Sequence, residues 1–348
     1  MTTTSFSALQ RDWNPGDLWD GYQATSLLEI PDLAKATGVA RVFIKNEAER
    51  PMGNFKVLGG MVAAFQAMKR RADTWLASND APLPLPHLVC ASDGNHGLAV
   101  AAAAQRMGVS ATVYLPTCAS PVRVRRIRAV GGRVVLVEGT YDDAVLAAQA
   151  AAGHEDGLLI PDTTPDPLDP VVSDVMAGYG RMTVELAAQF AALGAVRPTH
   201  AFVQAGVGGL AAAIATGLRA GMREPVRIIV VEPRHAACVA QALQQGRPVR
   251  VAGTLDTTAE MLSCGLASAP AVAVLLEHGA QSLLVDEALL AAAPATSLTN
   301  AGLASTPSGA AGLAGFMLAS ADRERRQEYG LGQDSIVLLI NTEGDVDD

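Results

Sequence analysis

The sequence has few aromatic residues, few cysteines and no excess of positive charge. Aromatic side chains make up 4% of the 348 residues, and Lys and Arg number 26 against 35 Asp and Glu. This acidic balance argues against a nucleic-acid partner, which would call for a broad basic surface. No apolar run reaches the roughly 18 residues that a membrane helix needs, so we expect no membrane partner either.

The N-terminal segment, MTTTSFSALQRDWNPGD, lacks the basic start and apolar run of a secretory signal peptide, so we expect a cytoplasmic protein. None of the four cysteines forms a C-x-x-C motif, and no metal site is predicted. Four free thiols are the expected state in a reducing compartment. A redox-active pair of Cys238 and Cys264 is the alternative, because both residues fall in one predicted domain.

Small apolar residues are abundant, and short β-branched runs alternate with helical patterns along the chain. Hydrophobic residues make up 49% of the chain, enough for a substantial core. Strands and helices that alternate at this spacing predict βαβ units and a parallel sheet. The predicted strands are His87–Ala91, Ala111–Leu115, Arg133–Val137, Thr199–Gln204, Arg227–Glu232 and Ser335–Ile340. The predicted helices are Gly97–Met107, Pro121–Val130, Tyr141–Ala152, Val171–Leu193, Leu210–Arg219 and one that opens at Ser308.

The predicted fold is α/β, with two three-layer α/β domains and mainly parallel sheets. Pro161–Pro170 contains four prolines and is predicted to be a loop between domains. A small domain, residues 54–163, would be inserted into a large domain made of residues 1–53 and 164–348. The early strand Arg41–Lys45 would pair within the large domain.

Lys56 follows the segment Gly53–Phe55 and opens a mostly apolar helix. A lysine at a helix N-terminus lies at the end of the macrodipole that disfavours its charge. Desolvation adds to this effect, so we expect a lowered pKa and a nucleophilic amine, as a Schiff-base lysine needs. An ordinary solvated lysine is the alternative.

Three polar or glycine-rich turns follow predicted strands, where parallel sheets bind ligands. The Ser92–Gly97 turn has backbone N–H groups that can hold a carboxylate, or it is an ordinary turn capped by Asp93 or Asn95. The Gly206–Leu210 turn contains three glycines in four positions and suits a phosphate. The Asn341–Asp345 turn follows the last strand, and its alternative is a plain surface turn.

These motifs, in this order, resemble the fold type II pyridoxal-phosphate (PLP) enzymes, and most closely the diaminopropionate ammonia-lyase-like group. The resemblance rests on GNFKVLGG, SDGNHGLAVA, PTHAFVQAGVGGLAAA, IIVVEP, LDTTAEMLSCG and LLINTEGDVD, and it runs from about residue 20 to the C-terminus. It implies PLP as the cofactor, bound by the large domain, and an amino acid as the substrate. It also implies a homodimer.

The resemblance assigns roles to single residues. Lys56 would form the Schiff base with PLP, Phe55 would pack beside the ring, and Asn95 would bind the ring 3′-oxygen. Thr342 would face the pyridine nitrogen. Asp93 and Asp162 would be catalytic carboxylates. The remaining expected residues are Gly206, Val207, Gly208, Gly209 and Leu210 for the phosphate, and Ser92, Asp93, Gly94 and His96 for the substrate.

The implied reaction is elimination of a β-substituent from a small amino acid, with 2,3-diaminopropionate giving pyruvate and ammonia as the best match. Either Lys56 or Asp93 would remove the α-proton. The chain departs from the group at Pro165–Asp174, which lacks an aromatic residue, and at Pro307, where relatives carry a glutamate. A β-replacement synthase, a serine or threonine dehydratase and a racemase therefore stay open as alternatives. A more distant one is a nucleotide-binding module that uses the Gly206–Gly209 turn.

Overall fold

The computed structural model describes residues 19, 21–78, 84–154, 157–221 and 226–345. These residues form two compact units. The small unit consists mainly of Lys56–Thr164 and Leu168–Gly178, and the large unit of Ala24–Phe55, Pro165–Pro167 and Tyr179–Asp348. The domain boundaries given above stay a prediction, and these units differ from them in grouping Leu168–Gly178 with the small unit.

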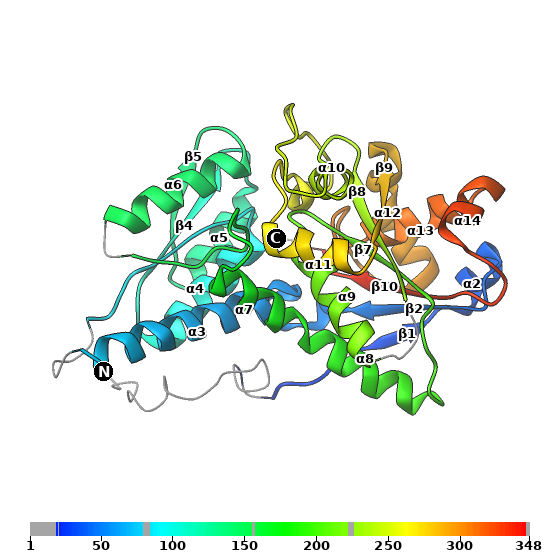
Figure 1. Ribbon diagram of the computed structural model, residues 1–348, viewed down its shortest axis with the longest axis horizontal. Coiled ribbons are helices and arrows are strands. Elements are labelled where there is room, and N and C mark those ends of the chain that lie inside the picture. Colours follow the sequence, from blue (N-terminus) through cyan, green and yellow to red (C-terminus); the bar gives the residue numbers. More distant parts are fainter. Residues whose placement is uncertain (1–18, 20, 79–83, 155–156, 222–225, 346–348) are drawn as a thin grey trace. The chain divides into compact units, whose positions relative to one another are not determined.

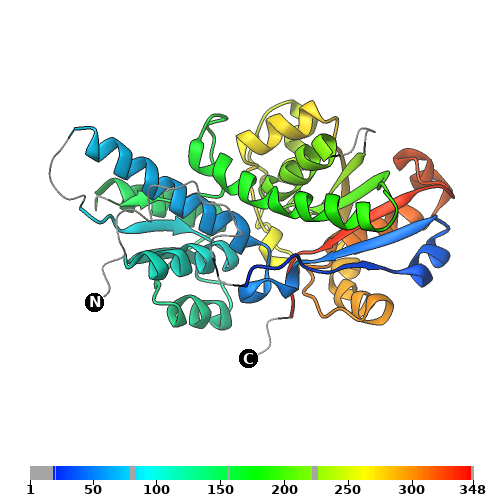
Figure 2. The ribbon, with the colours of Figure 1, turned by 90° about the horizontal axis from the view of Figure 1, so that it is seen from below.

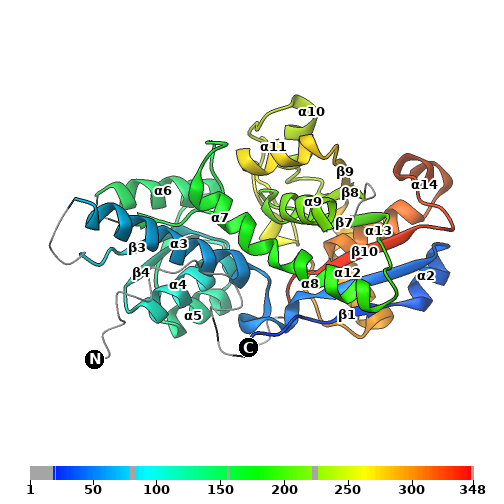
Figure 3. The same ribbon diagram turned by 60° about the horizontal axis from the view of Figure 1, so that its bottom comes forward.

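The small unit contains a four-stranded parallel sheet in the order β5-β4-β3-β6. Its central strand β3 is buried along its whole length, as expected of a parallel strand that is covered on both faces. Helix α6 covers one face, and α4 and α5 cover the other (Figure 3). The strands are β3 (Leu88–Ala91), β4 (Ala111–Pro116), β5 (Arg133–Val137) and β6 (Leu158–Leu159). The helices are α3 (Lys56–Leu76), α4 (Asn95–Met107), α5 (Pro121–Ala129), α6 (Tyr141–His154) and α7 (Pro170–Tyr179).

Small residues let the helices of this unit approach one another closely. A Cβ atom at Gly60 of α3 would stand 2.7 Å from the Cβ of Ala99 of α4. A Cβ atom at Gly178 of α7 would stand 2.4 Å from the carbonyl oxygen of Leu58. Helix α3, which begins at Lys56, therefore packs closely against both α4 and α7, with glycine at each point of contact.

The large unit contains a six-stranded sheet in the order β1-β2-β10-β7-β8-β9. Only β1 runs antiparallel to its neighbour among the described pairings. The last strand, β10, lies between β2 and β7, so strands from early and late in the sequence are neighbours in the middle of one sheet (Figure 1). The strands are β1 (Leu27–Glu29), β2 (Arg41–Asn46), β7 (His200–Gln204), β8 (Arg227–Pro233), β9 (Gln281–Val285) and β10 (Ile336–Asn341).

Helices cover both faces of the large sheet. Helices α8 and α9 lie on one face, and α2, α12 and α13 lie on the other (Figure 2). The buried core includes Phe202, Val231, Phe316 and Leu339. The helices of this unit are α2 (Pro31–Thr37), α8 (Arg181–Ala192), α9 (Gly209–Gly221), α10 (Cys238–Gln245), α11 (Ala269–Glu277), α12 (Glu287–Ala301), α13 (Ala311–Ser320) and α14 (Arg323–Tyr329).

Two predicted elements differ from the structure. The helix predicted over Val171–Leu193 is two helices, α7 and α8, separated at Gly180. The periodicity of the two helices is similar, so the pattern did not reveal the break, which falls next to Gly178 and Gly180, and glycine has low helix propensity. The helix predicted to open at Ser308 begins at Ala311, because Thr306 Oγ1 accepts a hydrogen bond from Gly309 N (2.9 Å) and holds a turn before it.

In the part of the chain that the structure describes, no helix is both long enough and apolar enough to cross a membrane.

Candidate active site

Lys56 is the first residue of α3, as predicted from the sequence. Its Nζ atom forms a hydrogen-bonded ion pair with Oδ2 of Asp162. The Asp162 side chain is 6% exposed and that of Lys56 is 22% exposed, so the pair lies at the edge of the protein interior. The Lys56 amine therefore has the Asp162 carboxylate beside it, in addition to the helix dipole and the desolvation expected from the sequence.

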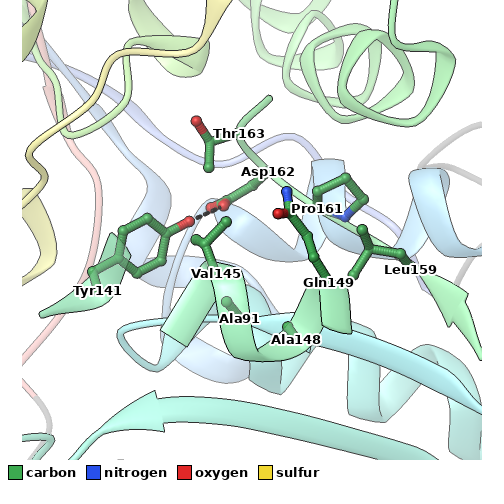
Figure 4. Close-up of a pocket in the computed structure, with 9 residues that line it drawn as sticks. All are labelled: Ala91, Tyr141, Val145, Ala148, Gln149, Leu159, Pro161, Asp162 and Thr163. Atoms are coloured by element: carbon green, nitrogen blue, oxygen red, sulfur yellow. Dashed lines mark hydrogen bonds between the residues drawn. The ribbon is translucent and has the colours of Figure 1, made fainter. Parts of the chain in front are cut away.

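The second oxygen of Asp162 is bound by Tyr141, the first residue of α6. The Tyr141 hydroxyl donates to Asp162 Oδ1 at 2.5 Å, and Figure 4 shows the ring pointing at the carboxylate. Beside this pair is a small cavity, with about 10 Å³ of space for the centre of a water molecule. That is close to the space one water needs. The cavity is lined by Ala91, Tyr141, Val145, Ala148, Gln149, Leu159, Pro161, Asp162 and Thr163.

The turn between β3 and α4 is held by Ser92. Ser92 Oγ accepts hydrogen bonds from Gly94 N (2.8 Å) and Gly97 N (2.9 Å). Among the described hydrogen bonds, the side chain that caps this turn is therefore Ser92 and not Asp93 or Asn95, and it takes up two N–H groups, those of Gly94 and Gly97. The Asp93 carboxyl is left without a capping role.

Gly94 has φ +144°, a backbone conformation that L side chains rarely adopt. A Cβ atom there would stand 2.7 Å from Cδ of Arg123, so the arginine side chain packs directly over this turn. The positive charge of Arg123 favours the ionised form of Asp93, although it does not decide that residue's protonation.

The two aspartates of the small unit have opposite pKa shifts. Burial raises the pKa of Asp93 to about 8, and the negative charge of Asp162 adds to the rise. Burial alone would also raise the pKa of Asp162. The charge of Lys56 outweighs it, together with that of His96 once the imidazole is protonated at acid pH. The hydrogen bonds from Lys56 and Tyr141 add to this effect, so the pKa of Asp162 is held well below its usual range. At neutral pH, Asp162 is a carboxylate and Asp93 is a carboxylic acid, an arrangement typical of acid–base sites.

His96 and Asn95 begin helix α4. His96 is buried, and its Nε2 lies 2.8 Å from the carbonyl oxygen of Ile160, two residues before Asp162. Burial lowers the pKa of His96, so it is neutral at pH 7 and holds the Asp162 loop. Its Nδ1 is buried without a hydrogen-bond partner among the described residues. Asn95 is the first residue of α4 and is 8% exposed.

The Gly206–Leu210 turn joins β7 to α9 in the large unit. Across the described chain, no hydrogen-bond acceptor is recorded for the backbone N–H groups of this turn. Gly208 has φ +97°, and a Cβ atom there would meet Val239 at 3.2 Å and Ala271 at 3.3 Å. These N–H groups and the start of α9 form a donor set suited to a phosphate.

Two thiols flank Gly206. Cys238 Sγ lies 3.3 Å from the carbonyl oxygen of Gly206, and Cys264 Sγ would stand 3.0 Å from a Cβ atom on that glycine. The structure forms no disulfide at any of the four cysteines, all of which lie in its described part, so Cys238 and Cys264 are not bonded to each other.

Thr342 lies directly after β10, and its hydroxyl is positioned by Gln204. Gln204 Nε2 lies 3.1 Å from Thr342 Oγ1 and 2.6 Å from the carbonyl oxygen of Gly309. Phe55 N donates to the carbonyl oxygen of Thr342 (3.0 Å), and the Phe55 ring packs on Tyr179 with centroids 4.9 Å apart. The backbone immediately before Lys56 is therefore hydrogen-bonded to the segment that contains Thr342.

The structure brings the predicted residues together in two groups. Lys56, Asp93, His96 and Asp162 interact in the small unit. The glycine turn and Thr342 are linked through Gln204 in the large unit. The positioning roles of Tyr141, Arg123 and Gln204 were not predicted from the sequence. Arg123 lies in an arginine-rich helix and Gln204 directly precedes the glycine turn, but neither pattern shows which group the side chain contacts.

The chemical groups that these residues offer are those that pyridoxal phosphate needs. The glycine turn offers N–H donors without recorded acceptors among the described residues, and Lys56 offers an amine. Thr342 offers a neutral hydroxyl in a buried position. Within residues 19–345 apart from the gaps given above, no group of three or more His, Cys, Asp or Glu is placed to hold a metal ion.

Comparisons with known proteins agree with this fit. The family model for pyridoxal-phosphate dependent enzymes matches residues 18–342. The chain is 30% identical to diaminopropionate ammonia-lyase of Escherichia coli K12, over 94% of the chain and 86% of that protein.

Solved structures give the same result. A crystal structure of diaminopropionate ammonia lyase from Escherichia coli in complex with D-serine superimposes with a TM-score of 0.84 and 28% identity, over 94% of this chain and 86% of that one. The crystal structure of a T.th. threonine deaminase gives a TM-score of 0.75 and 28% identity, over 94% of each chain. The predicted fold type, cofactor and lyase class are confirmed. The chain therefore belongs to the family of pyridoxal-phosphate dependent enzymes.

Proposed function

We propose that the chain eliminates the β-amino group of 2,3-diaminopropionate, giving pyruvate and two molecules of ammonia with the uptake of one water. The observation that carries this proposal is the ionised Asp162 beside Lys56, which offers a buried negative charge to a cationic side chain. The 30% identity to diaminopropionate ammonia-lyase supports the same substrate.

We assign the cofactor-binding role to residues of both units. Lys56 would bond covalently to PLP, Phe55 would pack beside its ring, and Asn95 would bind the ring 3′-oxygen. The Gly206–Leu210 N–H groups would bind the phosphate. Thr342 would place a neutral hydroxyl at the pyridine nitrogen. The bound cofactor withdraws electrons from the substrate's α-carbon and so makes its proton removable.

The chain's own residues then supply acid, base and charge. The Ser92–His96 turn would hold the substrate carboxylate, and the Lys56 amine would take the α-proton. Asp162 would attract the β-ammonium group, which already carries the proton with which it leaves as ammonia. A β-substituent that leaves less readily than ammonia needs a proton from an acid. Asp93 could give that proton, because it is protonated at neutral pH.

The second candidate is elimination of water from serine. The protonated Asp93 favours it, because a hydroxyl group leaves only when an acid protonates it. The two candidates therefore depend on different aspartates. Asp162 serves a cationic leaving group and Asp93 serves a neutral one.

Substitution of each aspartate tests this division. The purified holoenzyme is assayed for ammonia and keto acid with 2,3-diaminopropionate and with serine, each as D and L isomers. We expect Asp162→Asn to lower kcat/KM for the diamine by about 100-fold and for serine much less, because a buried charge partner is lost. We expect Asp93→Asn to show the reverse preference.

Asp174→Asn is the matched control, because Asp174 forms an ion pair with Arg70 (2.6 Å) in the same unit and has no proposed role in catalysis. It should leave the ratio of the two activities unchanged. Equal losses on both substrates in Asp162→Asn would contradict an ammonium contact. Trapping of the product by an added thiol would favour a β-replacement synthase instead.

The remaining expectations also stay proposals. We propose that the enzyme is a homodimer, as its resemblance to the family implies, and that it acts in the cytoplasm, as the sequence pattern led us to expect.

A further inference from the structure

Tyr141 is the one neutral donor on the Asp162 carboxylate among the described hydrogen bonds. It begins helix α6, its side chain is buried, and its hydroxyl lies 2.5 Å from Asp162 Oδ1 (Figure 4). The other carboxylate oxygen faces Lys56 Nζ. The carboxylate is thus held by one donor at each oxygen, from helices α3 and α6.

We propose that Tyr141 is a positioning residue that selects a cationic substrate side chain, by holding Asp162 ionised and in one orientation. This inference rests on the proposed function, since it concerns the group that would bind the β-ammonium. Tyr141 would touch neither substrate nor cofactor, and it would act through Asp162.

Lys56 cannot serve this purpose throughout the reaction. Its Nζ atom is the one proposed to bond to the cofactor and to carry the α-proton, so its charge changes as the reaction proceeds. The Tyr141 hydroxyl has no such second task. A hydrogen bond from a neutral donor to a buried carboxylate lowers the proton affinity of that carboxylate at every stage.

The protonation of Asp162 is coupled to several neighbours. The charged and titratable groups that interact with Asp162 or Asp93 are Lys56 of α3, Cys90 of β3, Asp93 and His96 at the start of α4, Arg123 of α5, and Tyr141 and Asp142 of α6. Asp93 and Asp162 repel each other's charge, so one of them holds a proton more readily when the other is ionised. The Tyr141 hydroxyl acts on only one of the two, and it favours ionisation of Asp162.

The test is Tyr141→Phe, which removes one oxygen and keeps the ring. In the holoenzyme, Lys56 would be bonded to the cofactor, so the hydrogen bond from Tyr141 would carry more of the effect on Asp162. The acid limb that Asp162 sets in the pH profile of kcat/KM for 2,3-diaminopropionate should therefore move upward by about one pH unit. The loss should appear more in KM than in kcat. The profile for serine should keep its acid limb, because serine does not need the negative charge of Asp162. The small cavity beside the pair would admit a water that replaces the hydroxyl in part, which limits the shift.

A binding measurement removes the dependence on turnover. 2,4-Diaminobutyrate has a cationic side chain without a β-leaving group, and norvaline has a methyl group in place of its ammonium. Calorimetric titration of the holoenzyme gives the ratio of their dissociation constants. We expect the wild type to prefer the diamine, Tyr141→Phe to lose about tenfold of that preference, and Asp162→Asn to lose it all.

Tyr329→Phe is the matched control. Tyr329 is also a buried tyrosine, and its hydroxyl donates to the backbone carbonyl of Ser282 (3.0 Å) in the large unit. It should change neither the acid limb nor the binding ratio. Introducing Tyr141→Phe into Asp162→Asn should add nothing, because the residue acts only through that carboxylate.

The outcomes separate this inference from the proposed function. An unchanged acid limb and binding ratio in Tyr141→Phe, with normal turnover of diaminopropionate by the wild type, would overturn the inference alone. The other informative outcome is that the wild type binds the diamine preferentially but does not turn over diaminopropionate, and that Tyr141→Phe loses this binding preference. That result would overturn the proposed function and leave the role of Tyr141 supported.

Discussion

Each unit contains a cluster of charged side chains that are buried or half-buried, and the two clusters are built differently. In the large unit, Lys45, Glu47, Arg50 and Glu185 form a network in which every charge has at least two partners. We call this network the closed cluster. The open cluster, in the small unit, consists of Lys56, Asp93 and Asp162. Lys56 is 22% exposed, and no hydrogen bond to the Asp93 carboxyl is found among the described residues.

The closed cluster satisfies its own charges. Arg50 donates to Glu47 (2.8 Å) and Glu185 (2.7 Å), and Lys45 donates to Glu185 (2.8 Å) and to the carbonyl oxygen of Thr25 (2.7 Å). Burial lowers the pKa of Lys45, while Glu47 and Glu185 keep the pKa of Arg50 above its usual value despite burial. Such a network holds the fold in one arrangement, because each charge is satisfied by its neighbours.

The open cluster keeps two carboxyl groups in different protonation states. Buried charge alone therefore does not mark an active site. A better indicator is a pair of ionisable groups with opposite pKa shifts, one of which lacks a hydrogen-bond partner for its carboxyl among the described residues. Arg50 and Lys56 are six residues apart in the sequence, so the closed cluster anchors the chain just before the residue that carries the chemistry.

The largest effect that this comparison predicts is the loss of activity in Lys56→Ala. Turnover should fall at least about 1,000-fold, since both the covalent attachment and the proton transfer depend on this amine. Borohydride reduction should no longer attach the cofactor to the protein, as measured by mass spectrometry. The exposed Lys35→Ala is the control. A variant that keeps reducible cofactor and full activity would remove Lys56 from the site.

The next largest effect is on folding, in Arg50→Met. Removal of the guanidinium leaves Glu47 and Glu185 with one buried cation between them, so the free energy of unfolding should fall by about 3–5 kcal/mol. Urea denaturation measures it. Adding Glu47→Gln to this variant should recover part of the loss, because it removes one unpaired charge. No loss in Arg50→Met would show that the closed cluster is not what stabilises this segment.

A smaller effect of opposite sign is expected for Asp93→Asn. The unfolded chain loses the Asp93 proton near pH 4, while the folded protein holds it up to about pH 8, so this carboxyl destabilises the fold increasingly between these values. The substitution should therefore stabilise the protein by about 1–3 kcal/mol at pH 8, with solvent screening included, and by almost nothing at pH 4. Thermal unfolding at both pH values checks it, and a gain that does not depend on pH would contradict the raised pKa.

The smallest effect is expected for an exposed ion pair, which sharpens the comparison with the buried ones. Arg41 and Glu29 form a 2.6 Å pair with side chains 29% and 37% exposed. Glu29→Gln should change the free energy of unfolding by less than about 1 kcal/mol, because water screens both charges. Arg41 is kept, so its stacking on Phe43 is undisturbed. A loss as large as that of Arg50→Met would mean that burial is not the deciding variable.

Local pattern was enough to predict much of the fold. Strands such as Arg133–Val137 and helices such as the one that begins at Tyr141 agree with the structure, because each is specified by periodicity over a few neighbouring residues. The position of Lys56 at a helix start and the glycine turn after β7 were likewise visible in consecutive residues.

Contacts between distant residues were not predictable in this way. Ser92, and not Asp93 or Asn95, accepts the hydrogen bonds from Gly94 N and Gly97 N, a choice among three similar polar residues that geometry decides. The break at Gly180 lies inside one continuous helical pattern, so periodicity did not mark it.

The sequence by itself determined the α/β alternation, the family and the residue types available for chemistry, since these follow from local pattern and motif order. Only the tertiary structure decided that Tyr141 and Lys56 share the carboxylate of Asp162, and that Asp93 keeps its proton beside it. The physical reason is that a protonation state depends on burial and on the charges within a few ångströms, and folding brings those charges together from residues that are far apart along the chain.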